Sequence, residues 1–76
     1  MKGIVLIHAK PGTSPAIVNA VRDLEGTTSC FAVFGRSDVV AFANVRDFTA
    51  LNHFALECAR VEGVTATETL PQVEVA

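Results

Sequence analysis

The chain has 76 residues, of which 50% are hydrophobic and 18% are charged, and its formal net charge is −2. This length leaves room for one core, so we expect a single domain over residues 1–76, and the apolar composition excludes a disordered chain. The net charge supplies no basic field for a phosphate backbone, so we expect no direct contact with nucleic acid. The apolar run at residues 4–7 is too short for a membrane span or a signal peptide, which predicts a cytoplasmic protein with no membrane partner.

The first third of the sequence predicts a strand followed by a helix. Residues 3–10 (GIVLIHAK) are almost continuously apolar and β-branched, which is typical of a strand buried on both faces. After a proline–glycine turn, Ser14 is predicted to cap a helix that has Pro15 at its first position. This helix is predicted to end at Gly26. Its apolar stripe consists of Ile17, Ala20, Val21 and Leu24.

The middle of the sequence predicts a β-hairpin. Residues 27–34 (TTSCFAVF) and 39–45 (VVAFANV) are rich in threonine, valine and aromatic side chains, which favour strands. The short segment between them contains a glycine and an aspartate, so it predicts a loop of about four residues. The loop residues are Gly35, Arg36, Ser37 and Asp38.

The last third predicts a second helix and a final strand. Asp47 is predicted to cap the helix, which Gly63 closes. Residues 64–70 alternate in the way expected of a strand, and we expect residues 72–75 to extend along the edge of the sheet. The apolar face of the helix consists of Phe48, Leu51, Phe54, Ala55, Cys58 and Val61.

The order of these elements predicts an α+β fold of the ferredoxin-like, βαββαβ kind, with a four-stranded antiparallel sheet and two helices on one face. The strands at residues 3–10 and 39–45 are apolar on both sides, so the other face of the sheet also needs a cover. That face spans about 400 Å² in projection, which matches the largest patch that a monomer tolerates. We therefore expect a homodimer in which two open sheet faces meet, a dimeric αβ barrel.

Several segments are similar to one known family. They are residues 9–12 with the helix that follows, residues 34–40 (FGRSDVV), the second helix with its Asp47-Phe48 start, and residues 61–69 with Gly-Val and Thr-Glu-Thr. Together they resemble the effector domain of Lrp/AsnC transcription regulators, which is often called the RAM domain. Family members usually carry a helix-turn-helix domain ahead of it, whereas this chain begins at the first strand. The resemblance therefore implies a stand-alone RAM domain.

The resemblance also implies a function and partners. It implies a non-enzymatic sensing and oligomerisation module that forms a dimer through the open sheet face and then a higher oligomer, an octamer-like ring. Effectors in the family are typically amino acids, bound between neighbouring dimers near the turn of the hairpin. Full-length Lrp/AsnC regulators are expected as further partners by co-assembly.

The hairpin loop is the leading candidate for the effector site. Exposed N–H groups in a turn at Gly35, Arg36 and Ser37 suit a carboxylate, and Asp38 can meet an ammonium group. The alternative is structural, because Gly35 can simply supply a positive φ and Asp38 can cap the turn. Arg36 at the tip can equally contact a neighbouring dimer.

A row of threonines on the last strand is the second candidate. Thr67 and Thr69 share one face with Thr65 by the two-residue period of a strand. The resemblance implies that their hydroxyls line the effector cleft, although threonine is also an ordinary strand former. Glu68 falls on the opposite face, where we expect it near the rim or paired with a cation of a neighbouring dimer.

The sequence contains no pattern typical of a metal site, cofactor site or nucleophile, so we expect neither a metal nor a cofactor. Cys30 and Cys58 are not spaced for zinc or redox chemistry and are predicted to be buried free thiols. His8 and His53 are predicted to be structural or surface residues. The alternative function is a small dimeric αβ-barrel enzyme of the monooxygenase or isomerase type, in which His8 or His53 faces a cavity.

Overall fold

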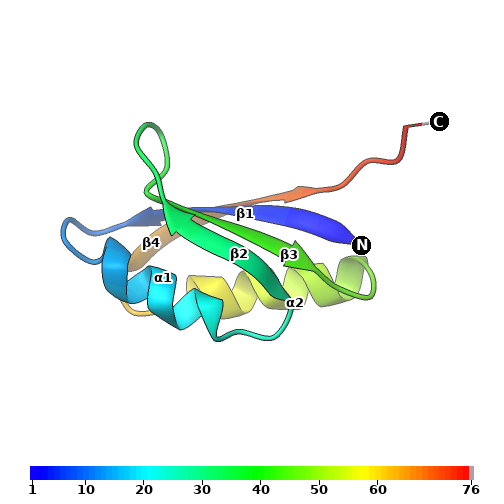
Figure 1. The fold of residues 1–76 in the computed structure, drawn as a ribbon, viewed down its shortest axis with the longest axis horizontal. Helices are drawn as coiled ribbons and strands as arrows, with labels where there is room; N and C mark the ends of the chain where they lie inside the picture. Colours follow the sequence, from blue (N-terminus) through cyan, green and yellow to red (C-terminus); the bar gives the residue numbers. More distant parts are fainter. Residues whose placement is uncertain (76) are drawn as a thin grey trace.

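The computed structural model describes residues 1–75 and confirms the βαββαβ order. Its strands form one antiparallel sheet in the order β2-β3-β1-β4. Helices α1 (Ser14–Arg22) and α2 (Phe48–Ala59) both lie on one face of that sheet (Figure 1). This is the predicted ferredoxin-like arrangement. The strands are β1 (Lys2–Ala9), β2 (Thr27–Ala32), β3 (Val39–Asn44) and β4 (Val64–Pro71).

The core lies between the sheet and the helices. In β1 the alternation of side chains sends Val5 and Ile7 toward the helices, where both are fully buried. Helix α1 packs mainly on β2, and α2 packs mainly on β4. Among the described residues every buried side chain is apolar or a cysteine, so hydrophobic burial is the main force that holds the two layers together. The core consists of Val5, Ile7, Ile17, Val18, Val21, Cys30, Val39, Ala41, Ala43, Leu51, Phe54, Ala55 and Cys58.

The start of α1 corrects one prediction, and the start of α2 confirms another. Thr13, and not Ser14, is the N-cap residue of α1, and its hydroxyl donates to the carbonyl of Lys10 (2.7 Å) instead of capping the helix. Pro15 therefore lies one position further into the first turn than predicted, where its missing N–H is equally harmless. Asp47 caps α2 as predicted, because its carboxylate accepts a hydrogen bond from the N–H of Ala50 (2.9 Å).

Both helices end earlier than the sequence predicts. Gly26 and Gly63 do not terminate them but form the turns that lead into β2 and β4, with φ of 100° and 98°. The turns begin at Leu24 and Val61, whose carbonyls accept hydrogen bonds from the N–H three residues later (3.3 and 3.2 Å). Each glycine thus occupies the third position of a β-turn that needs a positive φ. Leu24 and Val61 lie outside the helices, although both still pack against the core.

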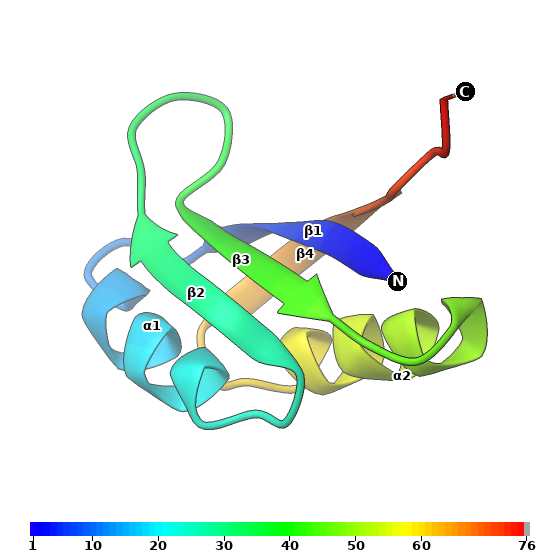
Figure 2. The same ribbon diagram turned by 45° about the vertical axis from the view of Figure 1, so that its right-hand side comes forward.

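The loop between β2 and β3 is longer than predicted. Strand β2 ends at Ala32, and the N–H of Val33 bonds to the carbonyl of Asp38 (2.9 Å), so residues 33–38 form the loop. Phe34, which the sequence predicts to lie in the strand, is fully exposed in this loop. The loop rises on the side of the sheet away from the helices in both views (Figure 2).

At the C-terminal end of the sheet, Gln72 continues the pairing with one hydrogen bond from its N–H to the carbonyl of Lys2 (3.0 Å). Residues 73–75 form no regular element, so the predicted extension along the edge holds for one residue only. Ala76, the last residue of the predicted domain, lies outside the described residues. The final segment rises on the same side of the sheet as the β2–β3 loop (Figures 1 and 2).

The face of the sheet opposite the helices is largely apolar and carries no cover in the described chain. We call it the open face. Phe31 and Leu70 on this face are 45% and 41% exposed. The strand register places side chains of the open face in rows across the sheet. The rows are Asn44 with Lys2; Ser29, Phe42, Ile4 and Leu70; Phe31, Val40, Leu6 and Glu68; and His8 with Ala66.

Candidate functional site

The β2–β3 loop brings together four of the six predicted site residues. Gly35, Arg36, Ser37 and Asp38 follow one another along the loop. Gly35 has a φ of 116°, which favours glycine, and a Cβ built on it would meet no atom within 4 Å. A ligand can therefore approach Gly35 from the side on which other residues carry a Cβ.

Asp38 has a defined structural position at the base of the loop. Its N–H donates to the carbonyl of Ile7 (2.9 Å), and its Oδ2 accepts a hydrogen bond from the N–H of Ala9 (2.8 Å). Asp38 directly precedes β3, and its carboxylate supplies an acceptor for the N–H of Ala9 at the end of β1, beyond Ile7, the last residue of β1 that pairs with β3. Asp38 thus has a structural role, but its carboxylate joins the base of the loop to β1 and forms no hydrogen bond within residues 33–38. The second carboxylate oxygen, Oδ1, accepts no hydrogen bond from the described residues.

The threonine row lies apart from the loop within one chain. Thr67 and Thr69 are opposite Ile7 and Val5 in the register, so they lie on the helix-covered face of the sheet. Both are partly buried on β4, an edge strand. Because the loop rises from the other face, one chain does not form a single cleft from all six residues.

Glu68 lies on the open face, where it is exposed and opposite Leu6. Its position at the edge strand agrees with the predicted location near a rim. Within the described chain it forms no ion pair.

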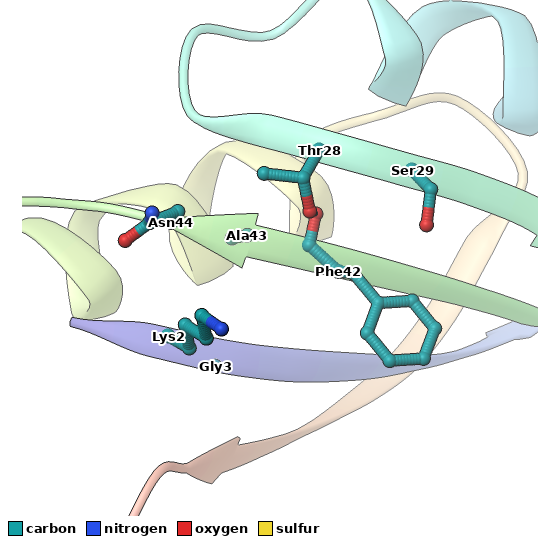
Figure 3. A pocket seen from close by; sticks show the side chains of 7 residues that line it. All are labelled: Lys2, Gly3, Thr28, Ser29, Phe42, Ala43 and Asn44. Carbon is teal, nitrogen blue, oxygen red and sulfur yellow. The ribbon is translucent and has the colours of Figure 1, made fainter.

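A hollow of about 370 Å³ lies at the other end of the open face from the loop, near the start of β1 and the end of β3. Figure 3 shows the Phe42 ring extending from β3 toward β1, with Lys2 and Asn44 on one side and Ser29 of β2 on the other. The Thr28 hydroxyl also lines it but donates to the Phe42 carbonyl (3.1 Å). Sequence reasoning missed these residues because they come from three strands. Only the strand register brings them together.

The histidines do not form a catalytic arrangement with other predicted residues. His53 lines a second, wide hollow of about 1300 Å³ between α2 and the turn after α1, where its side chain is 73% exposed and lies 3.5 Å from Glu57. His8 lies on the open face opposite Ala66. In residues 1–75 no group of three or more His, Cys, Asp or Glu side chains is placed to hold a metal ion. No helix in the same range is both long and apolar enough to span a membrane.

Both cysteines are buried in the core, which confirms that prediction. Burial raises the pKa of the Cys58 thiol to about 12, and the nearby Cys30 and Glu57 add to the shift. Burial also raises the pKa of Cys30, and the charge of Arg22 opposes that shift. The thiols are therefore protonated and poorly nucleophilic near neutral pH.

The fold and the open face define a class of protein, the ferredoxin-like α+β modules whose sheet is covered by helices on one face only. A family model described as the Lrp/AsnC ligand binding domain matches residues 2–75. The chain belongs to this family, as the resemblance predicts. No curated protein matches the chain.

Solved structures share this fold. TTHA0845 from Thermus thermophilus matches with a TM-score of 0.90 and 26% identity, over 99% of this chain and 95% of that chain. AsnC from E. coli matches with a TM-score of 0.82 and 18% identity, over 99% of this chain and 55% of that chain. The transcriptional regulator NMB0573 from Neisseria meningitidis, in complex with L-Met, matches with a TM-score of 0.77 and 21% identity, over 97% of this chain and 52% of that chain. The chain spans about half the length of these two regulators.

Proposed function

We propose that this protein is a non-enzymatic module that senses a small molecule of the amino-acid class and assembles through its open face. The observation that carries the proposal is the β2–β3 loop, in a chain that matches the Lrp/AsnC ligand binding domain along nearly its whole length. The solved structure of the regulator NMB0573, which shares the fold, is that of a complex with L-Met. This supports an amino acid as the effector.

The loop supplies complementary groups for a zwitterion. The backbone N–H groups around Gly35 suit a carboxylate, because Gly35 is exposed and a Cβ built on it would meet no atom within 4 Å. Asp38 keeps Oδ1 available for an ammonium group while Oδ2 holds Ala9. One carboxylate therefore fixes the base of the loop and binds the ligand.

Assembly completes the site in this proposal. A homodimer covers the apolar rows of the open face, and dimers then join into a higher, octamer-like ring. Since one chain keeps Thr67 and Thr69 apart from its own loop, the effector cleft combines β4 of one dimer with the loop of its neighbour. The exposed Phe34 and Arg36 at the loop tip supply contacts between dimers. Full-length Lrp/AsnC regulators offer the same kind of surface for co-assembly.

Calorimetry with a panel of amino acids, combined with light scattering, tests the proposal. Asp38→Asn keeps an oxygen acceptor for Ala9 but removes the charge, so it is expected to weaken binding at least about tenfold while the fold remains stable. Asp23→Asn, at an exposed position after α1, is the matched control and should bind like the wild type. Asp38→Ala leaves the Ala9 N–H without its acceptor and is expected to lower the free energy of unfolding by about 1–3 kcal/mol.

Two outcomes would contradict parts of the proposal. Unchanged binding by Asp38→Asn would remove Asp38 from the effector site, and silence of the wild type across the whole panel would leave only the assembly role. A mass that stays monomeric at all protein concentrations would refute the dimer.

A further inference from the structure

The hollow beside Phe42 has a ligand chemistry of its own. We propose that it binds a small carboxylate with an apolar body and no ammonium group, such as a 2-oxo acid. This would be a second site, because the hollow lies at the end of β3, whereas the effector loop precedes the start of β3. The two sites are thus separated by the length of the strand.

The polar groups of the hollow are suited to an anion. Lys2 supplies an ammonium, Ser29 a hydroxyl and Asn44 an amide, while the lining contains no acidic side chain. Glu68, the acidic residue placed on the open face by the register, lies two rows from the row of Lys2, about 13 Å along β1. The hollow is therefore locally cationic in a chain of net charge −2.

The floor of the hollow is suited to an apolar group. Phe42 and the aliphatic stem of Lys2 both line the hollow, so the apolar body of a ligand has partners there. The Phe42 ring points away from Lys2 (Figure 3) and stacks on Phe31, with 6.0 Å between the ring centroids. The hollow has a volume of about 370 Å³ and is open to solvent, so it suits a small ligand that keeps part of its surface in water.

The hollow and the loop differ in the charge of the ligand that they prefer. An amino acid placed here would bring its ammonium group close to Lys2 without any carboxylate to receive it, which disfavours the zwitterion. At the loop the Asp38 carboxylate receives the ammonium group of an amino acid. The hollow therefore prefers the 2-oxo acid, and the loop prefers the amino acid of the same carbon skeleton.

The hollow also affects assembly, a step that rests on the proposed dimer. When a second open face covers the first, the Lys2 ammonium near the contact loses part of its hydration, and no carboxylate of the described residues forms an ion pair with it. A bound carboxylate pairs with this charge, so ligand binding is expected to strengthen the dimer by mass action.

The test uses 4-methyl-2-oxopentanoate and leucine as matched probes, followed by calorimetry and by amide NMR spectra. The oxo acid is expected to bind more tightly than leucine and to shift the signals of Gly3, Ala43 and Asn44. Lys2→Met keeps the apolar stem and removes the charge, and it should weaken binding of the oxo acid at least about tenfold. Lys10→Met, exposed beyond the other end of β1, is the matched control and should bind normally.

The outcomes separate this site from the proposed function. Unchanged binding by Lys2→Met, or signals that shift only in residues 35–38, would overturn the second site. If the oxo acid binds wild type but not Lys2→Met while the protein stays monomeric, the hollow stands and the proposed dimer fails. If the protein is dimeric but does not bind the oxo acid, the hollow fails and the dimer stands.

Discussion

The two faces of the sheet have similar side chains but different surroundings. Ile4 and Ile7 belong to the same strand, yet Ile7 is fully buried under the helices, whereas Ile4 on the open face is only partly buried. The same holds in β3, where Val39 is fully buried and Val40 is not. Local composition therefore does not decide which face is covered.

The way in which the chain connects the strands decides which face of the sheet is covered. Each helix joins two strands by a crossover of the same hand, so both helices reach the same face of the sheet. The other face keeps its apolar rows without any element of the described chain to cover them. Substitutions on one face should therefore change folding, and those on the other should change association.

The largest effect is expected from Ile7→Ala. Removing a fully buried side chain leaves a cavity, so the free energy of unfolding should fall by about 2–5 kcal/mol, measured by urea denaturation. Ile4→Ala is the matched substitution on the open face. At low protein concentration Ile4→Ala should lower the free energy of unfolding clearly less than Ile7→Ala does. As the protein concentration rises and dimers form, the losses of the two variants should become more alike. Equal losses at every concentration would mean that the two faces are equivalent.

Leu6→Glu should break association without unfolding the domain. The new carboxylate lies opposite Glu68 in the middle rows, so closing the dimer would bury like charges. We expect the dissociation constant of the dimer to rise at least about a hundredfold, measured by analytical ultracentrifugation. Leu56→Glu, on the exposed side of α2, is the control and should leave the dimer intact. Loss of the dimer in both variants would point to a general effect of charge.

The sequence predicts the fold well because periodicity and turn residues report it directly. The apolar run of β1, the Asp47 cap and the order of elements are all local signals, and the structure confirms them. The ends of the helices are predicted less well, because a glycine after a helix can serve as a C-terminal residue or as the third residue of a turn. Gly26 and Gly63 are each the third residue of a turn. Only the hydrogen bond across the turn distinguishes this role from that of a helix C-terminal residue.

The candidate sites are predicted less completely, since they depend on contacts between distant segments. The hydrogen bond from Ala9 to Asp38 joins residues 29 positions apart, and no spacing rule indicates it. The position of Thr67 on the helix-covered face follows from its register with Ile7. Lys2, Ser29 and Phe42 meet for the same reason, so a lone sequence motif could not have identified the hollow.

The last prediction measures how well the covered face excludes water. Because burial raises the pKa of Cys58 from 9.0 to about 12, the folded state holds this proton at pH values where the unfolded state has lost it. The contribution is complete below pH 9 and is lost as the pH rises toward 12, at about 1.4 kcal/mol per pH unit. Cys30, whose pKa is also raised, acts in the same direction.

Urea denaturation between pH 8 and 11 under reducing conditions measures this contribution. The wild type should lose stability with rising pH more steeply than Cys58→Ala, which lacks the thiol. The substitution also leaves a small cavity, but that cost is the same at every pH, so the slope isolates the ionisation. Parallel profiles would show that water reaches Cys58 in the folded state, and the contrast between a dry covered face and an open face would then be smaller than the structure indicates.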